Sequence, residues 1–213
     1  PVLRVASLTI LLLAFSLLAA GGMAVGATLL VSPAPGPALL VVAQDGTGDF
    51  TTITDAVAAA RDGDTVRVMP GTYDESVTIT TDITLKGEGP SGSVVVRYRS
   101  GQGGAAFGIA LTDSAARVRD LTISGPAEGA GVRVNGGSPA LDGLNVVQTG
   151  EPTDEVPSAF EFVGGTTASL RDSSGTWFLT VSGSASPVVE RLEVDAGAFI
   201  SGTGNCMPPA PPR

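Results

Sequence analysis

The sequence predicts an all-β solenoid, a stack of short parallel strands closed at its N-terminal end by one short helix. Two observations predict this class. The 213 residues include 29 glycines, only 5% aromatic and 15% charged residues, a composition typical of short strands separated by turns. In addition, similar segments return every 19 to 29 residues after position 117, as expected for coils that bury their core by stacking.

The helix is predicted from a short periodic stretch. Thr51 or Thr52 can cap its N-terminus, and four apolar residues then follow at spacings that place them on one helical face. These residues are Ile53, Ala56, Val57 and Ala60. Asp62-Gly63-Asp64 should end the helix, and strands are expected at 39–43, 65–69, 77–79 and 83–85, with a turn at 70–73.

Residues 44–89 resemble the opening of pectin methylesterases. The shared pattern is DGxGDFTTIxxA, then DGDT, PGTYxE and ITLKGEG, and all four parts are present. This resemblance implies a right-handed parallel β-helix of the pectin-lyase-like superfamily. It implies the fold more strongly than an activity, because function resides in sites and not in folds.

The repeats continue beyond the region of resemblance. Four segments align, 118–123, 141–146, 170–175 and 189–194. A second class of strand falls between them, at 131–134, 159–162 and 178–181. One aligned position reads Arg119, Asp142, Arg171 and Glu190, so we expect one outward column of alternating charge. Ser173 and Gly175 replace larger apolar residues, which predicts a poorly packed or irregular coil there.

The domain limits follow from composition. Residues 39–201 form the predicted β-helix of about six coils, preceded by a Pro-rich linker at 32–38. Residues 202–213 are expected to be a disordered Pro-rich tail, in which Cys206 is an inert thiol or forms an intermolecular disulfide. A polar insertion at 151–157 should project as a loop.

Residues 5–31 carry no charge and exceed the roughly 20 residues that cross a bilayer. Two interpretations remain, a transmembrane anchor and a signal peptide cleaved near residue 27. The length favours the anchor, with Arg4 on the cytoplasmic side and the β-helix outside the cytoplasm. A secreted protein is the alternative. The chain begins with Pro1, and we expect an upstream cytoplasmic domain to precede it.

Composition excludes several functions. A net charge of −9 without basic clusters argues against binding nucleic acid and against polyanionic pectate as an unassisted ligand. Histidine is absent, which removes the most common general base and metal ligand. We expect no cofactor and no metal site. Asp45 and Asp49 lie among glycines at a spacing that fits turns and not a calcium loop.

Catalytic residues are not predicted. Pectin methylesterases carry two Asp, a Gln and an Arg in motifs such as QDT and DFIFG, and the resemblance does not extend to these motifs. Gln148 is followed by Thr and Gly, and the stretch 174–178 lacks the expected Asp. The paired carboxylates that acid–base chemistry requires are therefore not predicted. Asp120 and Asp172 share a column, but two coils would separate them by about 10 Å, too far to share one calcium ion.

Trp177 and Phe178 are the candidate ligand contacts. They could form a stacking platform for a sugar, although a core aromatic pair is the more common arrangement. The sequence therefore favours a membrane-anchored, non-catalytic β-helix ectodomain that binds carbohydrate or another cell-surface ligand. Similar domains follow a membrane span in bacterial receptor-like proteins, which suggests a sensor. The alternative is a truncated or degenerate polysaccharide-active enzyme of the pectin esterase or lyase type.

Overall fold

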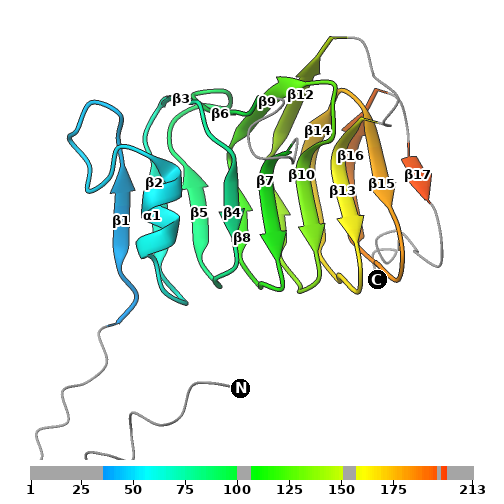
Figure 1. Ribbon diagram of the computed structural model, residues 1–213, viewed down its shortest axis with the longest axis horizontal. Coiled ribbons are helices and arrows are strands. Elements are labelled where there is room, and N and C mark those ends of the chain that lie inside the picture. Colours follow the sequence, from blue (N-terminus) through cyan, green and yellow to red (C-terminus); the bar gives the residue numbers. More distant parts are fainter. Residues whose placement is uncertain (1–35, 100–106, 151–156, 196–197, 201–213) are drawn as a thin grey trace, which may run out of the picture. The chain divides into compact units, whose positions relative to one another are not determined.

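The computed structural model describes residues 36–99, 107–150, 157–195 and 198–200. These residues form a parallel β-helix whose strands stand side by side from β1 at one end to β17 at the other (Figure 1). Every strand pairing is parallel. The predicted solenoid is confirmed.

After the first coil, which contributes only β1, the coils contribute strands to three faces. The first face contains β1 (Leu39–Val42), β2 (Thr65–Val68), β5 (Thr84–Gly87), β8 (Arg117–Arg119), β11 (Ala140–Asp142), the start of β14 (Ser169–Gly175) and β16 (Val188–Val194). The second face contains β3 (Gly71–Tyr73), β6 (Val94–Arg97), β9 (Thr122–Pro126), β12 (Asn145–Thr149) and the ends of β14 and β16. The third face contains β4 (Val77–Ile79), β7 (Phe107–Thr112), β10 (Ala130–Asn135), β13 (Ser158–Val163), β15 (Phe178–Val181) and β17 (Ala198–Ile200).

The alternation of side chains along each strand builds the core. In β2, Val66 and Val68 are fully buried, whereas Arg67 between them is exposed. The same period of two recurs along the stack, so aliphatic and aromatic side chains meet inside the coils. Among the largest fully buried side chains are Tyr73, Tyr98, Phe160, Phe162, Ile79, Leu85 and Ile109.

Helix α1 (Ile53–Ala59) closes the N-terminal end and contacts β1, β2 and β4. Thr52 is the N-cap, because its hydroxyl accepts a hydrogen bond from the Asp55 backbone N–H at 3.2 Å. Ile53, Ala56 and Val57 form the buried face. Both the cap and the face agree with the sequence prediction.

Two residues of the pattern shared with pectin methylesterases, Asp64 and Glu75, hold this cap in place through hydrogen bonds to backbone N–H groups. Glu75 accepts hydrogen bonds from the backbone N–H groups of Ile53 and Thr54, both at 2.8 Å, and so satisfies two of the free donors at the helix start. Asp64 accepts from the N–H groups of Ala38 at 2.7 Å and Arg61 at 2.9 Å. These hydrogen bonds lower the pKa of Asp64 below its usual value.

Asp45 and Asp49 also make turns, as predicted. One Asp45 carboxylate oxygen accepts from the backbone N–H of Thr47 at 3.0 Å, and Asp49 accepts from the N–H of Val41 at 2.8 Å. The Asp45 bond is a local side-chain-to-backbone bond of the kind that fixes a tight turn, whereas the Asp49 bond ties the turn back to β1.

A repeated left-handed corner separates the first face from the second. Asp120, Gly143, Asp172 and Arg191 occupy equivalent positions in successive coils, and all have positive φ, between 47° and 61°. Asp tolerates this conformation better than most residues, and Gly adopts it without a steric penalty. The shared column of Asp120 and Asp172 is thus a structural turn.

The predicted charge column is also confirmed. Asp142 lies opposite Arg119 on one side and Arg171 on the other, and Arg171 lies opposite Glu190. Arg171 and Glu190 form an ion pair with an Nε–Oε2 distance of 3.2 Å.

Two expectations are wrong in detail, and a third is confirmed in part. Residues 71–73 form strand β3, paired with β6, rather than a turn. Strand β1 is an end strand in which only Val42 is buried, while Leu39 is 49% exposed. The coil of segment 170–175 is irregular at β15 (Phe178–Val181), whose pairing with β13 shifts register between Ser158 and Phe160. Within the segment itself, Leu170, Ser173 and Gly175 are buried.

The packing of that segment has a simple cause. The Ser173 hydroxyl donates to the Arg171 carbonyl at 2.6 Å and accepts from the Leu144 N–H at 3.2 Å, so it is paired although buried. A Cβ on Gly175 would lie 2.3 Å from the Ala159 Cβ, so only glycine leaves room for the Ala159 side chain at this position. Small residues here complement the adjacent coil.

Several predicted segments cannot be compared with the structure. The expected membrane anchor or signal at 5–31, most of the linker at 32–38, the insertion at 151–157 except its last residue, and the tail at 202–213 lie outside the described residues. Within the described part of the chain, no helix has both the length and the apolar character needed to cross a membrane.

Candidate functional site

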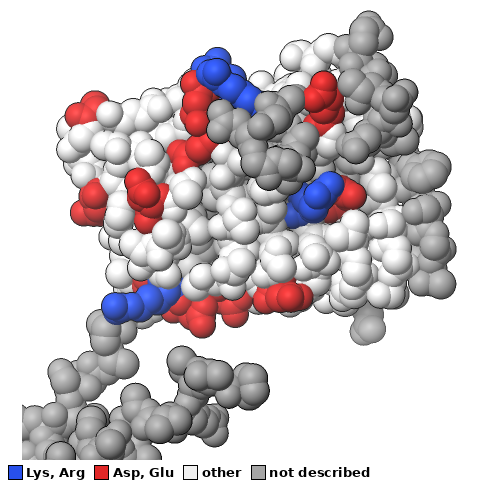
Figure 2. All heavy atoms as spheres, in the orientation of Figure 1, with Lys and Arg blue, Asp and Glu red and all other residues white. Residues whose placement is uncertain are grey.

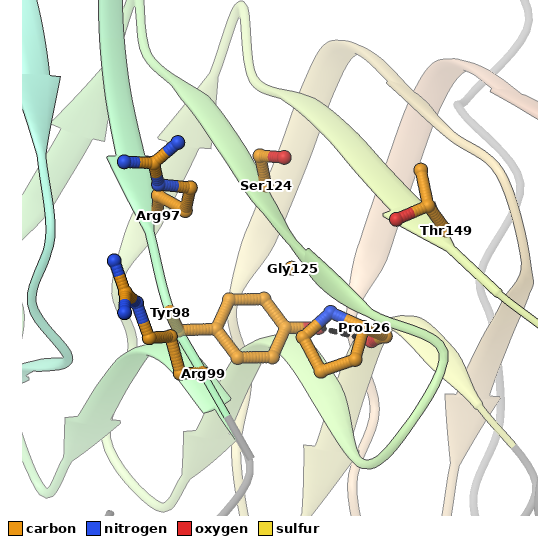
Figure 3. A pocket seen from close by; sticks show the side chains of 7 residues that line it. All are labelled: Arg97, Tyr98, Arg99, Ser124, Gly125, Pro126 and Thr149. Atoms are coloured by element: carbon orange, nitrogen blue, oxygen red, sulfur yellow. Dashed lines mark hydrogen bonds between the residues drawn. The ribbon is translucent and has the colours of Figure 1, made fainter.

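A surface cavity of about 360 Å³ opens where the strands of the second face end (Figure 3). Its lining comes from the ends of β6, β9 and β12 and from the residues that follow β6. The lining residues are Arg97, Tyr98, Arg99, Ser124, Gly125, Pro126 and Thr149.

Two arginines define the charge of this cavity. Arg97 donates to both carboxylate oxygens of Asp74, with an Nη2–Oδ2 distance of 2.8 Å, and Arg99 approaches Asp74 at 3.3 Å. These interactions, the hydrogen bond from Arg97 first, lower the pKa of Asp74 and raise that of Arg97. The three residues together carry one positive charge at neutral pH, and Arg99 is the most exposed of them.

The strand register explains why these groups meet. Tyr73 lies opposite Val96, so Asp74 follows β3 at the level of Arg97 in the next coil. Ser124 lies opposite Arg97, and Thr149 lies opposite Pro126. Guanidinium groups therefore share the cavity with two hydroxyl-bearing residues, a combination that can bind a carboxylate and sugar hydroxyls.

A buried polar pair supports the cavity from within. The Tyr98 hydroxyl donates to the Pro126 carbonyl at 3.0 Å and accepts from Gln148 Nε2 at 2.7 Å. Burial raises the pKa of Tyr98 to about 12. Gly125 makes room for this ring, because a Cβ there would lie 2.3 Å from Tyr98 Cε1.

Two buried polar atoms nearby have no hydrogen-bond partner within the described residues. They are Gln148 Oε1 and Trp177 Nε1, which belong to successive coils. Thr176, next to Trp177, accepts a hydrogen bond from the Gln148 backbone N–H at 2.9 Å.

The candidate aromatic contacts do not line the cavity. Trp177 and Phe178 are half-buried, and Phe178 begins β15 opposite Ser158 on the third face. The aromatic pair and the arginine cavity are thus separate features, and a sugar-stacking role for the pair stays a prediction.

Two carboxylates outside the cavity pair with arginines. On the third face, Glu161 accepts from Arg133 Nε at 2.6 Å, and Figure 2 shows that uncharged residues make up most of this side. At the corner, Asp172 pairs with Arg191 through an Nη2–Oδ2 distance of 2.6 Å, and this hydrogen bond lowers the pKa of Asp172. No group of three or more potential metal-binding side chains occurs in the described ranges.

The arginine cavity was not predicted, although the sequence contains a signal for it. Arg97 and Arg99 flank Tyr98, which is only 2% exposed. Two arginines on either side of a buried residue indicate two cationic side chains that project from the same surface of the coil.

Part of the chain is similar to pectinesterases. Residues 39–134, just under half of the chain, match the Pectinesterase family. A 70-residue stretch is 43% identical to "Probable pectinesterase/pectinesterase inhibitor 23" of Arabidopsis thaliana, which covers 30% of this chain but only 12% of that protein.

The fold is similar to that of a solved enzyme. "Pectin methylesterase from Carrot" superposes with a TM-score of 0.52 and 19% identity, over 79% of this chain and 65% of that one. The chain therefore spans less than two thirds of either protein. It has the parallel β-helix fold of pectin methylesterase, with a pectinesterase-like sequence over residues 39–134.

Proposed function

We propose that this protein binds an acidic polysaccharide of the pectin type, as a pectin-methylesterase-like protein. The observation that carries the proposal is the arginine- and hydroxyl-lined cavity on a β-helix whose sequence is pectinesterase-like over residues 39–134. Polymers of this type carry carboxylates and hydroxyls at regular intervals. The cavity offers donors to both groups.

The two arginines have different roles in this proposal. Arg97 is held by two hydrogen bonds to Asp74, so its guanidinium is fixed at the cavity wall. Arg99 is 62% exposed and contacts Asp74 only at 3.3 Å, so its guanidinium is available to bind a ligand carboxylate. Ser124 and Thr149 then hydrogen-bond to sugar hydroxyls.

Ester hydrolysis is the second candidate, and the similarity to pectinesterases favours it. That chemistry requires two carboxylates, one as nucleophile or base and one as acid. Glu161 on the third face is neutralised by Arg133. Glu151, Asp154 and Glu155 follow β12 in the sequence and lie outside the described residues. We therefore propose polysaccharide binding as the first candidate function and ester hydrolysis as the second.

The proposal does not include a sensor role, since neither the fold nor the similar proteins support one. It does include an extracytoplasmic location, with residues 5–31 as anchor or export signal, because such a polymer is a cell-wall component. A cytoplasmic domain upstream of Pro1 and the absence of nucleic-acid binding remain predictions from the sequence.

The test measures binding and hydrolysis on the same samples. Calorimetry with pectins of low and high methyl esterification gives the affinity, and methanol release gives the activity. We expect the Arg97→Gln, Arg99→Gln double variant to weaken binding by about tenfold, because each arginine offers a charge-assisted hydrogen bond.

The control is the Arg61→Gln, Arg171→Gln double variant, which changes the net charge equally but lies away from the cavity. Its affinity should stay within about twofold of the unmodified protein. Undetectable binding to every pectin would overturn the proposal. Methanol release above the blank would establish the second candidate.

A further inference from the structure

A second left-handed corner separates the third face from the first. Asp113, Gly136, Gly164 and Gly183 occupy equivalent positions in successive coils, because the strands before them pair in register. All four have positive φ, between 48° and 76°. Glycine adopts this conformation without a steric penalty, so three of the four coils turn here at little cost.

Asn135 is the last residue of β10 and directly precedes this corner. Its side chain is exposed, and its amide has no hydrogen-bond partner in the described ranges. A Cβ on Gly164 would lie 2.9 Å from Asn135 Oδ1, so the glycine in the next coil leaves room for the amide. The amide is therefore open to water and free to change its rotamer.

The backbone nitrogen of Gly136 is the neighbour that can react with this amide. It donates to the Val163 carbonyl at 3.4 Å, whereas the equivalent nitrogen of Asp113 donates to the Asn135 carbonyl at 3.0 Å. The Gly136 nitrogen is thus the more weakly held, since such bonds are usually near 2.9–3.0 Å. Gly136 has no Cβ to block the approach, and Gly137, also at positive φ, adds freedom to the backbone.

We propose that Asn135 is a site of spontaneous deamidation in the folded protein. The Gly136 nitrogen attacks the Asn135 side-chain carbon Cγ, and the new bond closes a succinimide ring. The side-chain nitrogen leaves as ammonia, with the proton that the Gly136 nitrogen gives up. Water then opens the ring at either carbonyl, which leaves aspartate or isoaspartate. The reaction needs no oxidant, reductant or cofactor.

Both products place a new carboxylate at a corner that is already acidic. Asp113 Oδ1 occupies the space that a Cβ on Gly136 would need, so this carboxylate lies against the reacting segment. Arg133, the one cation of β10, is already paired with Glu161 at 2.6 Å. The charge gained at residue 135 is therefore repelled by Asp113 and has little compensation from its own strand.

Isoaspartate has a further effect, because the main chain then runs through the former side chain and is one atom longer. Asn135 pairs with Thr112 in β7 and with Val163 in β13. An added backbone atom shifts this register and weakens the hydrogen bond from the Asp113 N–H to the carbonyl of residue 135. Deamidation thus loosens the corner. This inference does not depend on the function proposed for the cavity.

Asn145 is the comparison within the same chain. It is half-buried in β12, and its Oδ1 accepts a hydrogen bond from the Ser174 hydroxyl at 2.9 Å. The next residue is Val146, which is fully buried and β-branched, so its side chain crowds the attacking nitrogen. Both features should slow the same reaction at Asn145.

The experiment ages the full folded chain at mildly alkaline pH. Peptide mapping by tandem mass spectrometry locates the deamidation, and enzymatic methylation detects isoaspartyl groups. We expect Asn135 to convert at least about tenfold faster than Asn145, because the second amide is held and its neighbour is bulky. Hydrogen exchange at the Asp113 N–H should become about fivefold faster in the aged protein, as expected for the loss of one backbone hydrogen bond.

The Asn135→Gln variant keeps an amide but requires a larger ring, so both the isoaspartyl signal and the change in exchange should disappear. Asn145→Gln is the matched control and should leave the conversion of Asn135 unchanged. An intact Asn135 in the folded chain, under conditions in which the urea-unfolded chain converts, would overturn the inference. Equal conversion of Asn145 would also overturn it. Neither result bears on pectin binding at the cavity.

Discussion

The N-terminal and C-terminal coils follow the same repeat but are stabilised in different ways. Near the N-terminus, the carboxylates of Asp49, Asp64 and Glu75 accept hydrogen bonds from backbone N–H groups of other segments. At the other end, strand β16 has no buried residue, and the corner carries an exposed Asp172–Arg191 ion pair.

The difference shows what the pectinesterase-like pattern encodes. Side chains that satisfy a backbone donor must have the right acceptor at one position, whereas stacking requires only an apolar side chain of suitable size. Asp45, Asp49, Asp64 and Glu75, all within the pattern, belong to the cap and its first turns. The pattern is therefore strict where local hydrogen bonds define the chain path.

The largest difference is expected from one leucine in each region. Leu85 is fully buried, so Leu85→Ala should reduce the free energy of unfolding by about 2–5 kcal/mol. Leu192 is only partly buried, so Leu192→Ala should cost about 1 kcal/mol. Urea unfolding measures both. Equal losses would contradict the contrast between the two ends.

The next effect concerns the helix cap. Glu75→Gln removes a charged acceptor from two backbone N–H groups and should cost about 1–3 kcal/mol, with faster hydrogen exchange in α1. The exposed Glu193 is the control, and Glu193→Gln should change stability by less than about 0.5 kcal/mol. Unchanged exchange in α1 would mean that Glu75 does not hold the helix.

A third substitution tests the packing of the C-terminal coils. The repeat pattern suggests that Gly175→Val restores a core residue, but the structure predicts a loss of about 1–3 kcal/mol from overpacking against Ala159. Adding Ala159→Gly should recover part of that loss. A stabilising effect of the single substitution would show that the coil is loosely packed.

The smallest expected change in the free energy of unfolding at neutral pH concerns the Tyr98 hydroxyl, which links β6 to β9 and β12. Tyr98→Phe removes the hydroxyl between Pro126 and Gln148 and should cost about 0.5–1.5 kcal/mol. Tyr73→Phe, which removes a 2.9 Å bond to the Met69 carbonyl, is the matched comparison.

The same variant has a pH signature. The pKa of Tyr98 is raised to about 12 in the folded protein, above the unfolded value of about 10. Its contribution to stability is present below pH 10 and is lost as the pH rises towards 12, because the unfolded tyrosine ionises first. Tyr98→Phe should flatten this part of the stability curve. An unchanged curve would assign the alkaline loss to other groups.

Sequence reasoning was most successful where local chemistry decides the structure. The Thr52 cap, the helix face and the Asp45 turn could be predicted because the relevant partners lie within a few residues. The charge column could be predicted because the residues within its strands align one to one, although the loops between the strands differ in length.

Other features depend on partners in distant coils. Strand β3 resembles a turn because it follows Pro70, and only its pairing with β6 makes it a strand. Gly175 is explained by Ala159, and Asp74 by Arg97. In each case the partner is 16 or more positions away, and no local pattern specifies it.

The left-handed corner has a consequence for how such a chain can change length. Asp120 and Gly143 are equivalent points on successive coils, so deletion of residues 121–143 would rejoin the path at the same backbone geometry. One whole coil would be lost while the N-terminal cap stayed intact. The corner therefore makes the solenoid modular, but the deletion would set Arg119 beside Arg171. Evolution could vary the number of coils only by also revising the surface charges of the coils that become neighbours.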